Sequence, residues 1–522
     1  MFDKWLKLPA HYYLNITALV LLVIGVCLHN TLMSIGAIWI IANWLIEAKF
    51  KLYWANFKNN KALWALYGFF ILGFLSLIWT EDLAYAQKDF AQKVPLFVIP
   101  LVMGTAVRTE KKVLNFLLIL FLGILLLTSF INFYRFNVVL AASGDIREMS
   151  FFISHVRYAV LIALGMIACL YLFNVKKKAW YILTPIFLWL AYYTLKSQTI
   201  NGYVLLATVG IVTGAFTMYQ IKSRFLRGTL LLGAFTLVVV VFGIVKEGIT
   251  SYHSPVTLSP DEVELKTVNG RMYMHAFDLD ERENGNLVWM YVQAEELENE
   301  WNKRSVIAYD SLDRKGQPMF GTILRYMTSK GMNKDSVGVY ELQDSEIALI
   351  ENGCTSIESN SGLKSKFHEF LFQYDSYSNG GDPNGQSLLQ RLEHFKAAFS
   401  IIASNWFLGV GIGDVQSEFE RQYVRSETKL TIENQHRAHS QFLTFWISHG
   451  LIGIVLFLFF FLSVIKRRTQ KDVFFWGVFF VLFIACLFQD LIETQAGISL
   501  FALFYSLMAN VEDVNPEAQK AA

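Results

Sequence analysis

The feature that most constrains this chain is a series of long apolar segments. A bilayer core is about 30 Å thick, so a helix that crosses it needs about 20 apolar residues. Segments of roughly this length recur along the chain and predict an all-α polytopic membrane protein with about twelve transmembrane helices. The short segment 94–107 contains Pro95 and Pro100 and is expected to be a kinked helix or a half-helix. The predicted spans are 12–29, 31–47, 62–79, 94–107, 113–134, 155–174, 179–195, 200–219, 228–246, 441–465, 472–488 and 492–510.

Composition and charge distribution agree with this prediction. Hydrophobic residues make up 54% of the chain, against about 45–50% in soluble domains. A net charge of +2 gives no reason to expect a nucleic-acid partner. The short connections on one predicted side carry twenty Lys and Arg residues, and those on the other side carry six. Because basic connections favour the cytoplasmic side, both termini are predicted to be cytoplasmic, with the first helix retained rather than cleaved.

The chain is expected to divide into four regions. Residues 1–247 would form transmembrane helices 1–9, and 248–385 an inserted mixed α/β domain outside the membrane, where LVWMYVQA (287–294) alternates as strands do. Residues 386–440 would form amphipathic helices that carry the motif residues. Residues 441–522 would form helices 10–12 and a cytoplasmic tail. The amphipathic pattern after Gln386 predicts one apolar face made of Leu389, Leu392, Phe395, Ala398, Phe399 and Ile402.

Ionisable side chains gather at the predicted outer ends of the helices. Charged groups at a membrane boundary are costly, so each is a functional candidate. Arginine binds phosphate oxygens through paired donors, so this cluster favours an anionic substrate headgroup. The alternative is that the interfacial Arg and Lys residues anchor the helices by reaching to the headgroup region. The cluster comprises His155, Arg157, Lys196, Arg391, His436, Arg437, His439, Asp490 and Glu493.

His439 precedes a long apolar helix and is the strongest candidate for proton transfer. A histidine with a pKa of about 6.5 can accept a proton at neutral pH. The alternative is an interfacial histidine that hydrogen-bonds to the backbone. His436, His439 and His449 do not have the spacing of a zinc motif, so no metal is expected.

The stretch GVGIGD (409–414) resembles a dinucleotide fingerprint only superficially. It follows an amphipathic helix instead of a buried strand, and its glycine spacing differs from the fingerprint. A tight turn at the membrane surface is the expected structure. The chain contains neither a Walker motif nor a GxSxG elbow, which removes the ATPase and serine hydrolase interpretations.

Two adjoining stretches resemble a known family. QRLEHFKAAFSIIASNWFLGVGIGD followed by RAHSQFLTFWISHGLIGIVLFL is similar to the signature of the O-antigen ligase and O-antigen polymerase superfamily. Its elements are an Arg, an amphipathic helix, a Gly-x-Gly-x-Gly turn, and a His before a Gly-rich helix start. The resemblance is strong over about 386–465 and loose elsewhere. One departure is Asn201, which stands where members of the family commonly carry an Arg. Two alternatives stay open: Lys196 or Arg157 supplies that charge, or the substrate is bound in a different way.

The resemblance implies a membrane glycosyltransferase of the bacterial inner membrane with its active face in the periplasm. A glycan would move from polyprenyl pyrophosphate to an acceptor hydroxyl, on lipid A core or a similar glycolipid or glycan, without a metal or other cofactor. Arg391 would bind the pyrophosphate, and His439 would bind or deprotonate the acceptor. Arg157, Lys196 and Arg437 would be further substrate-binding residues. Membrane lipid is the remaining expected partner.

Three alternatives stay open at this stage. A polymerase or a protein O-oligosaccharyltransferase would use the same type of donor with another acceptor. A transporter or flippase is a different class, but transport sites lie near the membrane midplane, whereas these ionisable residues gather at one face. A membrane-anchored sensor would need a cytoplasmic output domain, which this pattern does not contain.

Overall fold

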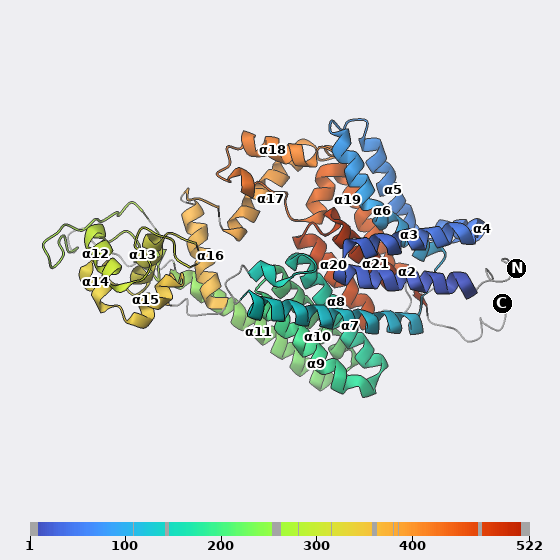
Figure 1. Cartoon of the computed structure of the whole chain (residues 1–522), viewed down its shortest axis with the longest axis horizontal. Helices are drawn as coiled ribbons and strands as arrows, with labels where there is room; N and C mark the ends of the chain where they lie inside the picture. The colour runs from blue at the N-terminus through green and yellow to red at the C-terminus, as the bar shows by residue number, and fades with distance from the viewer. Residues whose placement is uncertain are drawn as a thin grey trace. The chain divides into compact units, whose positions relative to one another are not determined.

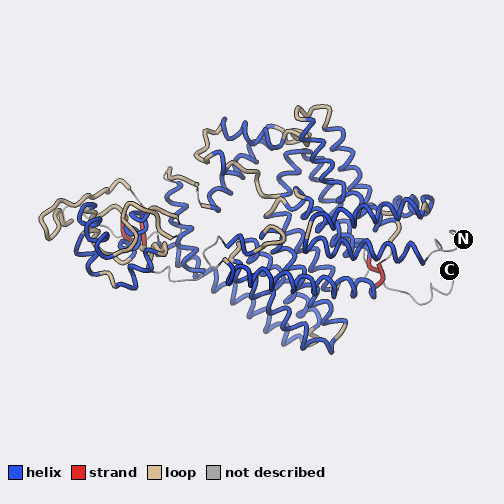
Figure 2. Tube along the Cα trace, viewed as in Figure 1, coloured by secondary structure: helices blue, strands red, loops and turns tan. Residues whose placement is uncertain are grey.

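A computed structural model describes residues 9–107, 109–140, 146–252, 263–279, 281–314, 316–357, 363–378, 380–384, 386–467 and 472–512. Helices dominate these residues (Figures 1 and 2). The chain forms two compact units, which are described separately. Unit 1 comprises Met1–Lys222, Glu393–Thr428 and Gln435–Ala522, and unit 2 comprises Ser223–Leu392 and Lys429–Asn434. Helix α17 (Ser387–Ser404) contributes residues to both units.

Each of the twelve predicted spans coincides with a helix. Eleven of these helices lie in unit 1, and α11 (Arg224–Tyr252) lies in unit 2. The helices of unit 1 are α2 (Pro9–Leu28), α3 (Asn30–Glu47), α4 (Phe50–Lys58), α5 (Lys61–Ser76), α6 (Leu83–Thr105), α7 (Lys111–Tyr134), α8 (His155–Val175), α9 (Trp180–Ser197), α10 (Ile200–Gln220), α18 (Val415–Arg425), α19 (Gln441–Arg467), α20 (Val473–Phe488) and α21 (Gln495–Asn510).

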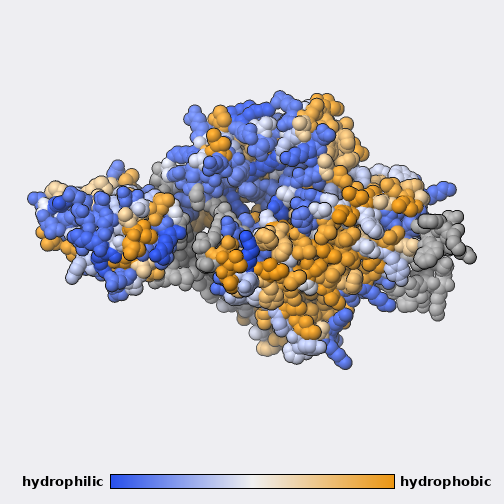
Figure 3. All heavy atoms as spheres, in the orientation of Figure 1, coloured by the Kyte–Doolittle hydropathy of each residue, from blue (hydrophilic) through white to orange (hydrophobic). Residues whose placement is uncertain are grey.

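Five helices in the described part of the chain are long and apolar enough to cross a membrane. The number rises to six if α3 and α4, which are bent by 113° at their junction, form one broken span. Apolar side chains cover the outer face of α7 and α9, as a lipid-facing surface requires (Figure 3). The structure therefore supports a polytopic membrane protein, and the number of twelve spans stays a prediction.

Helix α6 differs from its predicted form. Segment 94–107 is not a separate half-helix, because α6 runs through both prolines as one helix of 23 residues and the segment supplies its second half. The predicted kink at the prolines stays a prediction. The helix begins at Leu83 because the Asp82 side chain caps it, accepting the backbone N–H of Tyr85 at 2.8 Å. The added first half is what brings Asp89 and Lys93 into the bundle.

The core of unit 1 combines one pair of consecutive helices with pairs that are distant in the sequence. Helix α2 packs on the next helix, α3, whereas α5 packs on α19 and α6 packs on α21. Helix α8 is buried along most of its length between α9, α10 and α20. Two short parallel strands, β1 (Thr109–Glu110) and β4 (Val511–Glu512), pair with each other beside α7. The packing of α19 and α21 against N-terminal helices fixes the position of the candidate site.

Helix α19 is broken at Gly450, whose backbone has φ 64° and ψ −165°. At the break, neighbouring backbone groups of α19 lose their helical hydrogen-bond partners. Residues of the connection between α17 and α18 replace these partners. The N–H of Val410 donates to the Ile447 carbonyl at 2.8 Å, and the N–H of Leu451 donates to the Trp406 carbonyl at 2.8 Å. A Cβ atom at Gly450 would lie 2.0 Å from the carbonyl oxygen of Phe407, so only glycine fits this crossing.

The expected tight turn at GVGIGD is present and ends at Asp414, immediately before α18. The Asp414 carboxylate accepts the backbone N–H groups of Glu81 at 2.8 Å and Asp82 at 2.9 Å. It thereby joins the start of α18 to the connection between α5 and α6. The turn links three elements of unit 1, which explains the need for small residues at this position.

The predicted apolar face of α17 is only partly buried in the protein. Leu389, Ala398 and Ile402 of that face are buried, whereas Phe399 is 56% exposed. His394 is 2% exposed and Ile401 is also buried. The buried stripe is rotated toward residues 394 and 401, because an imidazole occupies a position that an apolar pattern does not mark.

Unit 2 contains short helices and one pair of very short antiparallel strands, β2 (Arg282–Glu283) and β3 (Asn286–Leu287). Its remaining helices are α12 (Ala294–Arg304), α13 (Met319–Ser329), α14 (Ser336–Glu341), α15 (Asp344–Glu351) and α16 (Leu363–Ser378). The alternation seen at 287–294 appears as burial of Val288, Met290 and Val292, but not as an extended strand. A mixed α/β domain is therefore not confirmed.

The predicted orientation can be tested with single cysteines at two exposed serines. We expect Ser378→Cys to react with a membrane-impermeant thiol reagent in intact cells, and Ser223→Cys to react only after the membrane is permeabilised. The four native cysteines are buried, so they contribute little background labelling. Labelling of Ser223→Cys alone in intact cells would reverse the orientation.

Candidate functional site

His439 lies two residues before α19 in an unusual backbone conformation. Its φ of 49° is in the left-handed region, which costs a residue other than glycine about 1–3 kcal/mol and persists where the surrounding structure enforces it. The side chain is 42% exposed, so the imidazole remains reachable. Such strain in a partly exposed histidine is a reason to expect a function.

Asp490 supports this histidine from the connection between α20 and α21. Its Oδ2 atom lies 3.6 Å from Nδ1 of His439, and its carboxylate also interacts with the His439 backbone N–H. The Thr444 hydroxyl donates to Oδ1 of Asp490 at 2.8 Å, which fixes the carboxylate. Burial, with repulsion from Glu493, raises the pKa of Asp490 to about 6.

A network of buried charges surrounds this pair. Lys93 lies 2.9 Å from Asp89 and 3.3 Å from Glu493, and its side chain is 8% exposed. Arg437 lies 3.3 Å from Glu493 and also donates to Tyr85 and Gln416. Its guanidinium group is therefore engaged by the protein, and the predicted contact of Arg437 with substrate stays a prediction.

Gln441 connects the charged network to the backbone. Its side-chain N–H donates to the Glu493 carboxylate at 2.8 Å, and its side-chain carbonyl oxygen accepts the Ile492 backbone N–H at 2.7 Å. The first turn of α19 is thus tied to the connection that carries Asp490. If one partner of a buried ion pair moves away, the other charge is left buried and uncompensated, which is unfavourable. We therefore expect the side chains of this network to keep their positions.

Two further imidazole rings lie beside His439. The ring centroids of His394 and His439 are 5.5 Å apart, and those of His436 and His439 are 6.0 Å apart. His449 is separate, because it is buried inside α19 and stacked on Phe69 at 4.3 Å. Among the described residues, no three His, Cys, Asp or Glu side chains are grouped so that they could hold a metal ion.

Arg157 reaches the same site from the first turn of α8. It interacts electrostatically with Asp490 and donates from one terminal nitrogen to the Ser154 hydroxyl at 2.9 Å. Its Nε atom is buried and has no hydrogen-bond partner within the described part of the chain. A buried donor without a partner is costly, and an anionic oxygen of a ligand would satisfy it.

The placement of the other two predicted cations, Lys196 and Arg391, at this site stays a prediction. Lys196 is exposed at the end of α9, with its ammonium group 5.9 Å from the Tyr192 ring centroid. Arg391 is half-buried on α17 in the part of that helix that belongs to unit 2. Its placement in one cavity with His439 stays a prediction.

Several residues of the site were not singled out by their sequence pattern. Asp89, Lys93 and Tyr85 lie on the part of α6 that precedes the predicted span, and Thr444 and Gln441 look like ordinary polar residues at a helix start. The one available indication was the pair Asp89 and Lys93, which are four residues apart and lie on one helix face.

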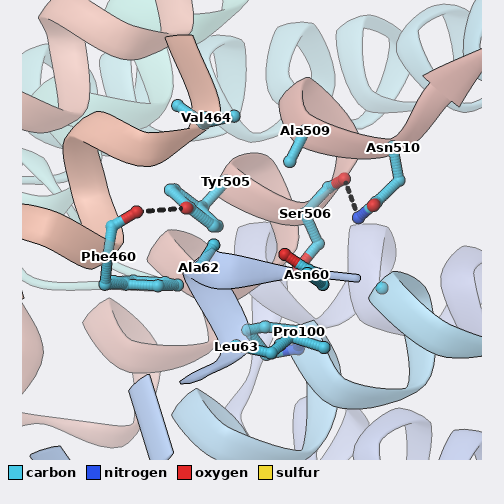
Figure 4. A pocket seen from close by; sticks show the side chains of 11 residues that line it. Asn60, Ala62, Leu63, Pro100, Phe460, Val464, Tyr505, Ser506, Ala509 and Asn510 are labelled. Carbon is cyan, nitrogen blue, oxygen red and sulfur yellow. Dashed lines mark hydrogen bonds between the residues drawn. The ribbon is translucent and has the colours of Figure 1, made fainter. Parts of the chain in front are cut away.

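A small cavity lies between the start of α5 and the C-terminal parts of α6, α19 and α21 (Figure 4). Its volume is about 10 Å³, and Asn60, Ser506 and Asn510 line it. Polar atoms of these three side chains are buried without a partner among the described residues. A space of this size holds about one water molecule, so it is too small for a glycan or a lipid.

Comparison with known proteins adds one finding. Residues 356–458 match the model of the family described as O-antigen ligase. The matched segment contains Arg391, Arg437 and His439, and it ends inside α19. No curated protein matches the chain.

The raised pKa of Asp490 gives a test of its burial. In the unfolded chain an aspartate titrates near about 3.9, so the folded state binds this proton more tightly, and that stability is lost as the pH rises through about 6. Lowering the pH from 7 to 4 should therefore stabilise the wild type relative to Asp490→Asn, by roughly 2–3 kcal/mol. Thermal unfolding of both proteins in detergent measures this difference; a difference independent of pH would contradict it.

Proposed function

Because residues 356–458 place this chain in the O-antigen ligase superfamily, we propose that it is a ligase-type glycosyltransferase. It moves a glycan from polyprenyl pyrophosphate to an acceptor hydroxyl at the periplasmic face of the bacterial inner membrane. The observation that carries this proposal is the pairing of His439, in the matched segment, with Asp490 outside it.

In the proposed reaction His439 accepts the proton of the acceptor hydroxyl as that oxygen attacks the anomeric carbon. The bond between the sugar and the pyrophosphate oxygen breaks, and the pyrophosphate leaves with the bonding electron pair. Asp490, 3.6 Å from Nδ1 of His439, stabilises the imidazolium and orients the ring so that Nε2 takes the proton. Asp490 is a positioning residue in this scheme, because its own contact is with His439.

Arg391 is proposed to bind the pyrophosphate and to stabilise the charge on the leaving group. Its place on α17 supports this role. It precedes His394 by three residues, and residues three apart lie on the same face of a helix. His394 in turn lies beside His439, with ring centroids 5.5 Å apart.

Arg157 is proposed to supply the second phosphate-binding charge, in place of the arginine that is missing at Asn201. Its electrostatic interaction with Asp490 and its buried Nε atom without a partner in the described structure support this choice over Lys196. Lys196 is exposed and near Tyr192.

We expect His439→Ala to reduce glycan transfer about 10²–10⁴-fold, because it removes the proton acceptor. His436→Ala is the matched control: the same residue type lies three positions earlier, and its loss should have a much smaller effect. The assay measures transfer of lipid-linked glycan to acceptor in membranes that contain equal amounts of each variant. Full activity of His439→Ala would refute the proposed role.

Arg391→Lys tests the phosphate contact. Lysine keeps the charge but lacks the planar donor pair, so it should lower transfer, and Arg391→Ala should lower it further. The same membranes assayed with a chelator should retain activity, since the proposed chemistry uses no metal. Loss of activity with chelator alone, or transfer that survives Arg391→Ala, would argue against this mechanism. Offering a core glycolipid or a lipid-linked repeat unit as the acceptor separates a ligase from a polymerase.

The two candidate cations can be compared directly. Arg157→Gln should weaken the use of the lipid-linked donor by tenfold or more, since a charge-assisted hydrogen bond to phosphate contributes about 1.5–3 kcal/mol. Lys196→Gln makes the corresponding change at an exposed site and should leave donor use nearly unchanged. Donor titrations at a fixed acceptor concentration report the effect. A larger loss for Lys196→Gln would exchange the two assignments.

A further inference from the structure

A groove of about 610 Å³ runs between α3 and α6 and is closed at one end by the start of α21. It is open on one side, where Ile38 and Val94 are 65% and 49% exposed. Its volume lies within the range of about 300–1,000 Å³ that is usual for ligand sites. All of its lining residues belong to unit 1.

The groove changes character along its length. Toward the N-terminal ends of both helices its lining is polar, with Ser34 on α3 and Lys88 and Gln92 on α6. Further toward the C-terminal ends of the same helices the lining is apolar, with Ile38, Ile41, Val94 and Val98. The predicted topology has both helices start at the outer side, so the polar end faces the headgroup region and the apolar part extends into the bilayer. This order matches an amphipathic lipid.

The polar end of the groove is joined to the charged network of the site. The Gln92 side-chain amide donates to the Glu493 backbone carbonyl at 2.7 Å. The Glu493 carboxylate in turn binds Lys93 and Arg437, each at 3.3 Å. Gln495, at the start of α21, hydrogen-bonds to Ser34 of α3. A lipid whose tail lies in the groove would therefore carry its headgroup beside this network.

We propose that the groove between α3 and α6 holds the single polyprenyl chain of the glycan donor, with its pyrophosphate directed to the Lys88 end. This inference rests on the proposed function and assigns one subsite of it. A single-chain lipid fits one groove, whereas a phospholipid has two tails to accommodate. The ammonium group of Lys88 complements the charge of the anionic headgroup. The apolar side chains of the groove would contact the isoprenoid chain in place of membrane lipid.

A binding experiment tests the groove without any need for turnover. A photoreactive phenylalanine analogue at Ile38 should crosslink to radiolabelled undecaprenyl pyrophosphate in liposomes of the purified full-length protein. The same analogue at Ile71, which is 56% exposed on α5 and outside the groove, is the control. Crosslinking at Ile38 that exceeds the control, and that excess unlabelled polyprenyl pyrophosphate removes, supports the proposal. Equal labelling at both positions, or preferential labelling by a phospholipid probe, overturns it.

A blocking variant tests the same groove by activity. Ala91→Trp fills the groove, and Ala84→Trp places the same side chain two turns earlier on the exposed part of α6, outside the groove. The donor chain enters the groove from bilayer lipid and not from water, so packing contacts decide its affinity. Loss of roughly ten carbon–carbon contacts corresponds to about a tenfold loss of affinity. We expect Ala91→Trp to raise the KM for a long-chain donor about tenfold, with little change for a donor whose prenyl chain is too short to enter the groove.

The results separate this inference from the proposed function. If the wild type transfers glycan and Ala91→Trp uses long-chain donor as well as Ala84→Trp does, the groove assignment is wrong and the function stands. If no glycan is transferred from any donor, the proposed function fails, and the crosslinking result still decides whether the groove binds polyprenyl pyrophosphate. Equal loss with short-chain and long-chain donors would indicate general damage by the tryptophan and would also overturn the assignment.

Discussion

The interruption of α19 at Gly450 is the constraint on which the rest of the site depends. A helix in a bilayer must satisfy its backbone groups within the protein, because lipid offers no partners. Here the turn after α17 provides them, through hydrogen bonds between Val410 and Ile447 and between Gly411 and Ser448. The first two turns of α19 are thereby fastened to the turn, and the position of His439 at their start follows from this attachment.

A network of buried charges is the second element of the site, and its main effect is to fix the positions of the elements that it joins. Lys93, Glu493 and Arg437 are each no more than 13% exposed as side chains. Removing them from water is unfavourable, and replacement by apolar residues is often neutral or stabilising. The network is therefore better explained by what it fixes than by stability. It joins α6, the start of α19 and the connection that carries Asp490, three elements that are far apart in the sequence.

The sequence and the structure agree best where a periodic pattern covers a whole helix. Each predicted span coincides with a helix, because some 20 apolar residues leave few alternatives. The turn at residues 409–414 could also be predicted, since its glycines stand out, and the role of His439 stays a prediction. The start of α6 at Leu83 could not, because its cap and its polar first half resemble a loop. The pairing of Asp490 with His439 depends on tertiary packing between α19 and the connection after α20, which no local pattern encodes.

At His439, the residue that best fits the left-handed backbone differs from the residue that supplies the imidazole. Glycine adopts this conformation at little cost, so a glycine at this position would relieve local strain while it deletes the imidazole. A library selected only for thermal tolerance in detergent would thus tend to enrich chains that lack the proposed proton acceptor. Any attempt to stabilise this protein therefore has to hold position 439 constant, since local stability favours glycine there and the proposed catalysis favours histidine.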